Sequence, residues 1–232
     1  MCVNFSPTSK ANMKKVFAVE QAPRDDEYKE EVFPGDMAPI ILPGWQGAAI
    51  PDCILAMFGM VPTWATPELA RHTYNARSET VAEKPSFRLA WQRGQFCLIV
   101  ADAFYEPRYT EHGVERCRLS AKDGQPLVFA GIWDVHPKLN QLFSFSMLTI
   151  NADDHPLMQQ FHKPREEKRM PVLLDAAAQE AWLQAESRQA AQMLLPWDAE
   201  LLQVAVAPLK RRAPRTARAA SAQPMGEQGS LF

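Results

Sequence analysis

The chain begins Met1-Cys2, and this start offers the most unusual chemical reactivity in the sequence. If Met1 is removed, Cys2 carries a free α-amine and a thiol on adjacent carbons. Their ordinary pKa values are about 8 and about 8.5, so both groups are partly nucleophilic at neutral pH. With an aldehyde, the amine forms a Schiff base and the nearby thiol can close a five-membered thiazolidine ring. Many proteins start Met-Cys without using it, so this pair alone does not establish a function.

Three further segments combine polar side chains with apolar or turn context. They are Tyr74–Glu79, which contains Asn75 and Arg77; Asp102–Pro107, which contains Glu106; and the stretch from His162 to Leu174. Each has a plain structural alternative. An asparagine can hold a turn, an arginine can pair with a glutamate on the surface, and a histidine can belong to a loop. No segment decides a function by itself.

In this order, the segments resemble the SRAP family, the SOS-response-associated peptidases, also called abasic-site processing proteins. The matching pieces are Met1-Cys2, Phe58–Trp64, Asn75–Thr80, Cys97–Glu106, Phe129–Trp133, Phe145–Thr149, and His162 followed by Arg169–Val172. The most specific are Asn-Ala-Arg-x-Glu-Thr and Arg-Met-Pro. The match spans residues 1 to about 208.

The resemblance implies a covalent link to abasic sites in single-stranded DNA, whose open-chain sugar carries an aldehyde. It implies that the Cys2 amine attacks C1′ and that the Cys2 thiol closes the ring, after Met1 has left by self-removal. Glu106 is then the candidate acid and base. His162 would protonate the sugar oxygen during ring opening, and Asn75 would orient the sugar and the backbone of Cys2.

The same resemblance implies a set of DNA contacts. Arg77 offers a planar fork that matches a phosphate. Trp64 would stack on a base beside the lesion, with a place in the core behind Pro62 as its alternative. Pro39 would line the binding groove.

Three departures from the family pattern affect this site. Val3-Asn4 replaces the usual Gly-Arg and removes a phosphate or structural contact. Pro107 replaces the tryptophan that usually follows the glutamate. A short charged insertion, Pro164–Lys168, stretches the spacing before Arg-Met-Pro and leaves His155 as a rival to His162. We favour His162, because its place before Arg-Met-Pro matches the family order.

The C-terminal segment carries a separate signal. From Lys210 onward the composition shifts to Arg, Ala, Pro, Ser and Gln, which predicts a flexible, disordered basic tail over residues 209–232. The last five residues, with Gln228, Leu231 and Phe232, resemble the Gln-x-x-Leu-Phe peptide by which bacterial repair proteins bind the sliding clamp. A meaningless terminal pentapeptide is the alternative.

Composition limits the class of protein. Of the 232 residues, 47% are hydrophobic and 22% charged, which is typical of a soluble globular protein. The part before Lys210 has 20 basic and 26 acidic residues, a net charge of −6, so DNA contact there requires a local groove. No apolar run reaches the length of a membrane span and no signal-peptide core is present. We therefore expect a cytoplasmic, nucleoid-associated monomer. The scattered cysteines predict no metal site, and no cofactor is indicated.

Short strands and isolated helices must position these residues. Helices are predicted over 10–20, 67–72 and 86–92, and one or two helices over 175–195. Strands are predicted over 53–59, 95–101, 127–131, 142–150 and 201–206. This mixture predicts an α+β domain over residues 1–208, with a curled, mainly antiparallel, barrel-like sheet flanked by short helices.

Two other functions remain open at this stage. One is a peptidase with Cys2 as N-terminal nucleophile and Glu106 or His162 as base. The other is a noncatalytic single-strand-binding adaptor recruited to the clamp. Intact mass separates them, since loss of Met1 supports a reactive N-terminus and counts against the adaptor.

Overall fold

A computed structural model describes residues 3–17, 19–44 and 51–209. The strands are β1 (Asn4–Pro7), β2 (Met37–Leu42), β3 (Asp52–Phe58), β4 (Asn75–Arg77), β5 (Phe96–Thr110), β6 (Gly113–Ala121), β7 (Leu127–His136), β8 (Leu142–Asn151), β9 (Arg169–Pro171) and β10 (Leu202–Val206). The α-helices are α1 (Lys10–Phe17), α2 (Arg88–Gln92), α3 (Ala176–Gln184) and α4 (Ser187–Gln192). Short 3-10 turns are η1 (Asp25–Glu27), η3 (Pro67–His72), η4 (Met158–Gln160) and η5 (Ala199–Leu201).

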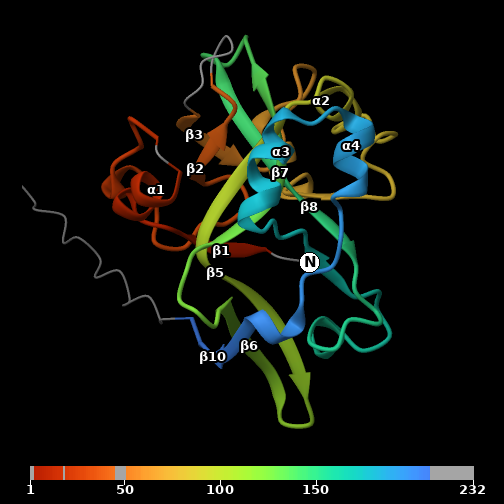
Figure 1. Ribbon diagram of the computed structural model, residues 1–232. Helices are drawn as coiled ribbons and strands as arrows, with labels where there is room; N and C mark the ends of the chain where they lie inside the picture. Colours follow the sequence, from red (N-terminus) through yellow and green to blue (C-terminus); the bar gives the residue numbers. More distant parts are fainter. Residues whose placement is uncertain (1–2, 18, 45–50, 210–232) are drawn as a thin grey trace, which may run out of the picture.

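Five strands close into a barrel. β5 pairs with β2, β2 with β3, β3 with β8, β8 with β7, and β7 returns to β5. Among the described strands, only the pairings of β8 with β3 and with β4 are parallel. Closure leaves these five strands without an open edge, and the helices lie outside the wall (Figure 1). The predicted α+β class with a curled, mainly antiparallel sheet is confirmed.

The long strand β5 has two halves with different neighbours. Residues 96–101 lie in the barrel wall, with β7 on one edge and β2 on the other. Residues 103–110 leave the barrel and pair with β6 on one edge and β1 on the other. β5 therefore carries side chains from the barrel wall into an outer layer built by β1, β6 and β10.

Aromatic side chains fill the barrel. The rings of Phe58 and Phe145 stack with centroids 5.3 Å apart, and Phe5 meets Phe58 edge-on at 5.3 Å. Phe104 and Phe129 make a second edge-on pair at 5.7 Å. All five rings are essentially inaccessible to solvent. Edge-on and offset contacts suit the ring quadrupoles, so these pairs contribute beyond the area they bury.

The helix α3 closes one side of the barrel. Asp175 caps it by accepting a hydrogen bond from the Ala178 amide at 2.9 Å. Trp182, which is fully buried, lies 4.7 Å from the ring of Phe96 and donates its indole N–H to the Cys97 carbonyl at 3.1 Å. The placement of Trp182 on the apolar face of a helix, expected from the sequence, is confirmed.

Gly59 directly follows β3 and has a positive φ of 113°. A Cβ atom at this position would lie 2.2 Å from the carbonyl oxygen of Ala70, in the 3-10 turn η3. Glycine is required here on both counts, because other residues rarely adopt this φ and no side chain fits. The close approach brings η3, and the loop before it, against the end of the barrel.

Most predicted elements are present with changed limits. The predicted strand 95–101 is too short, because β5 continues to Thr110 and includes Asp102–Pro107. The predicted helical region 175–195 divides into α3 and α4 around Ala185-Glu186. The strands β1, β2, β4, β6 and β9 were not predicted. The tail from Lys210, like Cys2, lies outside the described residues, so the boundary at residues 208–209 stays a prediction.

Candidate active site

Glu106 lies on the outer half of β5, two residues after Phe104. Alternate residues of a strand face the same side, so its side chain shares the face of Phe104, which packs into the core. The Glu106 side chain is fully buried. A carboxylate at such a depth requires a charged or hydrogen-bonding partner.

His162 provides one such partner. Its Nε2 lies 3.0 Å from Oε2 of Glu106, and its side chain is only 8% exposed. The backbone explains the approach, because the His162 amide donates to the carbonyl of Pro107 at 2.9 Å. Just before it, Phe161 forms an isolated bridge with Arg108 and is fully buried. The histidine loop is thus fastened to β5 beside Glu106.

His162 has a φ of 64°, in the left-handed region. A residue with a side chain adopts this conformation at a cost of about 1–2 kcal/mol, and such strain gathers at functional sites. Within the described part of the chain neither ring nitrogen has a hydrogen bond of good geometry, and only Nε2 lies within ion-pair distance of a carboxyl group. The strained backbone therefore holds the ring with one nitrogen toward a carboxylate and the other available to a further group.

His155, the rival histidine, has a different environment. Its Nδ1 accepts hydrogen bonds from the amides of Leu157 and Met158 at 3.2 and 3.1 Å. That nitrogen therefore carries no proton, so Nε2–H donates to the carbonyl of Trp197 at 2.7 Å. Both ring nitrogens are engaged by the backbone, which gives His155 a structural role and favours His162 for chemistry.

Asn75 opens β4, opposite Met147 on β8. It is buried, with 9% of its surface exposed. Glu106 lies on β5 and Asn75 on β4. In the sheet these two strands are connected through β7, which pairs with β5, and β8, which pairs with β7 and with β4. On the other edge of β5, β1 begins at Asn4, which is opposite Tyr105. Cys2 lies two residues earlier in the sequence, outside the described residues.

Arg77 ends β4 with a half-exposed side chain. Its Nη1 donates to Oε2 of Glu167 at 2.8 Å. The other oxygen of Glu167 accepts from Arg169 at 2.7 Å. Arg169 is 2% exposed and also makes a two-pronged contact with Glu79, at 2.8 and 2.9 Å. Glu79, the glutamate of the same segment, thus pairs with Arg169, while Arg77 pairs with Glu167.

The remaining predicted DNA contacts differ in exposure. Trp64 is 59% exposed in the loop before η3, which excludes its alternative as a core tryptophan. Pro39 is buried within β2, opposite Leu55 on β3. Its place in a groove stays a prediction.

The three described cysteines are poor nucleophiles. Burial raises the pKa of the Cys53 thiol to about 12, and burial also raises the pKa values of Cys97 and Cys117. A thiol with a raised pKa is almost entirely protonated at neutral pH. Thiolate chemistry at these positions is therefore disfavoured.

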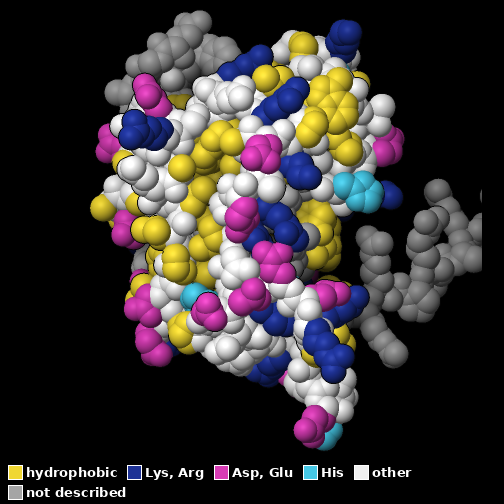
Figure 2. All heavy atoms as spheres, turned by 90° about the vertical axis from the view of Figure 1, so that its right-hand side faces the viewer, with side chains coloured by type: hydrophobic (Ala, Val, Ile, Leu, Met, Phe, Trp, Pro, Cys, Tyr) yellow, Lys and Arg dark blue, Asp and Glu magenta, His cyan; other side chains and the backbone are white. Residues whose placement is uncertain are grey.

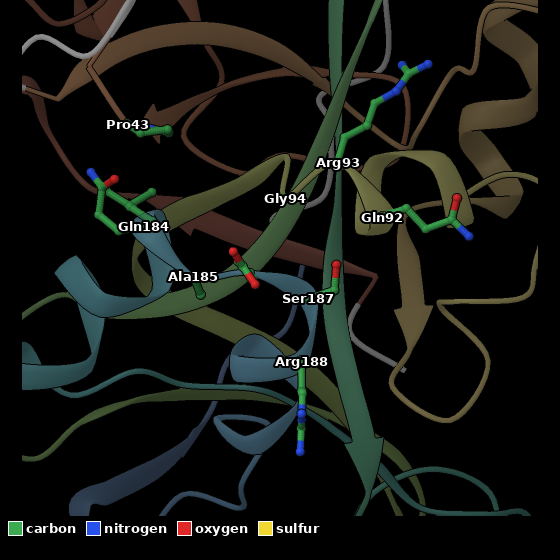
Figure 3. Close-up of a pocket in the computed structure, with 10 residues that line it drawn as sticks. Pro43, Gln92, Arg93, Gly94, Gln184, Ala185, Ser187 and Arg188 are labelled. Carbon is green, nitrogen blue, oxygen red and sulfur yellow. The ribbon is translucent and has the colours of Figure 1, made fainter.

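A hollow of about 500 Å³ lies between the end of α2 and the turn that joins α3 to α4 (Figure 3). Its lining includes Pro43, Gly94 and Ser187, and none of the predicted site residues. Arg93 and Arg188 point away from each other (Figure 3). Within the described ranges, no three His, Cys, Asp or Glu side chains gather as metal ligands.

The surface charge gives no broad basic region on the face seen in Figure 2. Acidic and basic side chains alternate down its centre. Contact with a polyanion on this face would depend on single arginines and lysines. Among the described helices, none has the length and apolar character to cross a membrane.

The model of the family described as SOS response associated peptidase (SRAP) matches residues 1–210. The chain belongs to this family. Curated SRAP relatives include the abasic site processing protein YoqW of Bacillus subtilis, 32% identical over 152 residues, which cover 62% of this chain and 63% of the relative. The abasic site processing protein HMCES of Rattus norvegicus is 28% identical over 177 residues, covering 61% and 48%. The chain thus spans less than two thirds of these relatives.

Solved structures share the fold of this chain. A crystal structure of a protein from Bordetella bronchiseptica has a TM-score of 0.81 and 33% identity, covering 90% of this chain and all of that one. One from Bacteroides thetaiotaomicron has a TM-score of 0.72 at 24% identity, covering 88% and 91%, and shows the fold alone.

The structure also accounts for one departure from the SRAP pattern. Asn4, in place of arginine, donates to Oε2 of Glu31 at 3.3 Å. The same oxygen lies 2.6 Å from Nη2 of Arg116, whose guanidinium stands 3.6 Å above the ring of Tyr105. Arg116 thus supplies a positive charge close to the start of β1. Sequence reasoning missed Arg116 and Glu31, and no motif marked them.

Arg169, Glu79 and Glu167 were also missed as a group. The first two lie inside the motifs that identify the SRAP family, but no role was assigned to them. Glu167 belongs to the charged insertion, where sequence alone gave no sign of a partner. Buried charged residues require partners, so the two charged residues of these motifs, Arg169 and Glu79, could have been matched with each other from the sequence.

Proposed function

We propose that the protein binds single-stranded DNA and links Cys2 covalently to abasic-site aldehydes through a thiazolidine, as part of DNA repair. The observation that supports this most is the buried contact of 3.0 Å between Glu106 and His162, on the strand that pairs with β1. The names of the SRAP relatives, abasic site processing proteins, support the substrate class.

The chemistry needs only groups that the chain supplies. The Cys2 amine adds to the aldehyde carbon C1′, and loss of one water gives a Schiff base. The Cys2 sulfur then adds to the same carbon, its proton passes to the nitrogen, and the thiazolidine closes. Overall, an aldehyde and an aminothiol give a thiazolidine and one water. Because amine and thiol share one residue, ring closure is intramolecular and strongly favoured.

Proton transfers are the part that Glu106 and His162 would assist. The carboxylate of Glu106 would take a proton from the attacking amine and return it to the departing water. His162 would protonate the sugar ring oxygen, which opens the ring to the aldehyde. Asn75, buried at the start of β4, would orient the sugar. Their burial excludes competing water.

The cysteine must first become the N-terminus. Hydrolysis of the Met1–Cys2 peptide bond consumes one water and frees the amine. Self-removal of Met1 would be the peptidase activity of this chain. Intact mass tests this step: loss of one methionine is expected in the wild-type protein, and retention of Met1 in a protein that still crosslinks would contradict it.

Single-strand binding would use the exposed side chains. Arg77 would contact a phosphate and Trp64 would stack on a base, while Pro39 would line the groove. Because the part before Lys210 has a net charge of −6, we expect modest affinity for undamaged DNA with strong dependence on salt.

The experiment that tests the proposal is direct. The protein is incubated with single-stranded DNA that carries one abasic site, and a denaturing gel is searched for an adduct. The wild-type protein should form the adduct and Cys2→Ala should not. Cys53→Ala is the matched control and should crosslink normally. Absence of an adduct with the wild-type protein rejects the proposal.

The C-terminal peptide would recruit the protein to the sliding clamp. Leu231 and Phe232 would enter an apolar pocket while Gln228 bonds at its rim, and the basic stretch from Lys210 would touch DNA nonspecifically. Deleting residues 228–232 should abolish clamp binding and leave crosslinking intact. Loss of crosslinking in this variant would contradict the proposal that the C-terminal peptide serves only clamp binding.

A further inference from the structure

Glu167 engages one guanidinium nitrogen of Arg77, a donor that a DNA phosphate could also use. Its Oε2 accepts from Nη1 of Arg77 at 2.8 Å. A carboxylate and a phosphate offer an arginine fork the same kind of partner, an anionic oxygen in the plane of the guanidinium. The two groups would therefore compete for Nη1 of Arg77.

The carboxylate is held in place by deeper residues. Its Oε1 accepts from the buried Arg169 at 2.7 Å and from Asn151 at 3.3 Å. The hydrogen bond to Arg169, the favourable charges of Arg169 and Arg77, and the bond from Asn151 lower the pKa of Glu167, against the raising effect of burial. An isolated surface pair contributes little, because two long side chains must be ordered. Here Glu167 is already ordered by Arg169.

Arg77, by contrast, is free to change partner. Its side chain is 47% exposed, and the contact with Glu167 uses the single nitrogen Nη1. Water screens this contact more strongly than the contact of the same carboxylate with Arg169. Approach of a phosphate would draw Arg77 away and leave Glu167 on Arg169.

We propose that Glu167 is a built-in phosphate mimic, which holds Arg77 in the DNA-free protein and reduces the affinity for single-stranded DNA. The inference rests on the proposed role of Arg77 as a phosphate ligand. It assigns a function to the charged insertion Pro164–Lys168, which carries Glu167. The insertion would keep undamaged single strands from occupying the site for long.

The test is equilibrium binding of undamaged single-stranded DNA, which does not depend on crosslinking. Glu167→Gln keeps an oxygen that can accept from Arg169 and removes the charge. It should bind about two- to fivefold more tightly than the wild type, a size that fits a partly exposed charge pair. The gain should shrink at high salt, because salt screens exposed charges.

Glu166→Gln is the matched control. It removes the same charge from the neighbouring residue, whose contact is a long one of 3.7 Å to the exposed Lys163. Its affinity should stay close to the wild type. An equal gain in both variants would show a general charge effect and overturn the inference.

The Arg77→Ala variant distinguishes a failure of this inference from a failure of the proposed DNA contact of Arg77. Alone it should weaken binding, and Glu167→Gln should then give no further gain. If Arg77→Ala weakens binding but Glu167→Gln changes nothing or weakens it, the mimic is wrong and the DNA contact stands. If Arg77→Ala has no effect, the proposed DNA contact itself fails. Glu167→Asp is the second variant to use if Glu167→Gln unfolds. It keeps the negative charge on a shorter side chain, and tighter DNA binding by this variant would support release of Arg77.

Discussion

Two side-chain pairs of almost equal length lie at different depths in this molecule. Glu106 and His162 are 3.0 Å apart, with side chains 0% and 8% exposed. Arg77 and Glu167 are 2.8 Å apart, with side chains 47% and 34% exposed. In the buried pair, little water surrounds the two groups, so electrostatic interactions there are screened weakly. In the exposed pair, water takes part and partners can be exchanged. Under the proposed function, depth rather than distance distinguishes the pair assigned to the chemistry from the pair assigned to DNA binding.

The Glu106→Gln variant tests most directly whether the buried pair serves the chemistry and not DNA binding. The amide keeps the shape but cannot take a proton, so the crosslinking rate should fall by about 10³-fold. Affinity for undamaged single-stranded DNA should stay within about twofold, since the group is buried. Adduct formation over time and equilibrium binding measure the two effects. A normal rate would remove Glu106 from the chemistry.

His162→Asn tests the other half of the buried pair. Asparagine tolerates the left-handed φ of this position, so the loop should keep its shape. The crosslinking rate should fall by about 10²-fold. The same substitution at His155 should leave the rate unchanged and lower the free energy of unfolding by about 1–3 kcal/mol, because buried backbone groups lose their partners. The reverse pattern would exchange the roles of the two histidines.

Trp64→Ala tests the exposed region. Loss of one stacked base should cost about 1–3 kcal/mol of binding free energy, at least roughly fivefold in affinity. The maximal rate at saturating DNA should change little. Val114→Ala removes a similarly exposed apolar side chain on β6 and should not alter binding. Equal loss in both variants would contradict a specific stacking role.

The smallest expected effect is the acid sensitivity of the network around Arg169. Its hydrogen bonds and charge lower the pKa values of Glu79 and Glu167. Their ionised forms therefore stabilise the folded protein above the ordinary carboxyl pKa of about 4.3. This stability is lost as the pH falls through their lower folded values. Unfolding curves at several pH values should show a smaller acid loss in Glu79→Gln than in the wild type.

The parts of the fold that sequence predicted are those with strong local patterns. β7, β8 and β10 are apolar runs between turn signals, and α3 has a capping aspartate and a buried tryptophan face. The short strands β4 and β9 were not predictable. Each has three residues and is defined by partners on β8, far along the chain. Local periodicity does not carry that information.

The site divides in the same way. Family resemblance named Glu106 and His162, and the structure brings them into contact. The family resemblance assigned no role to Glu167 or Arg116, because each contacts a residue that is distant in the sequence and near only in the folded chain. Glu167 meets Arg77 across 90 positions, and Arg116 meets Glu31 across 85. Polar pairs over such distances leave no regular spacing in a sequence.

The close contact at Gly59 has a consequence for natural variants of this chain. A single-base change in a glycine codon commonly replaces it with alanine, serine or valine. At this position the new side chain would force η3 away from the end of β3, and with it the loop that carries Trp64. Every reactive side chain would still be present. A survey that compared only those residues would class such a variant as competent, although one methyl group had displaced the loop that carries Trp64.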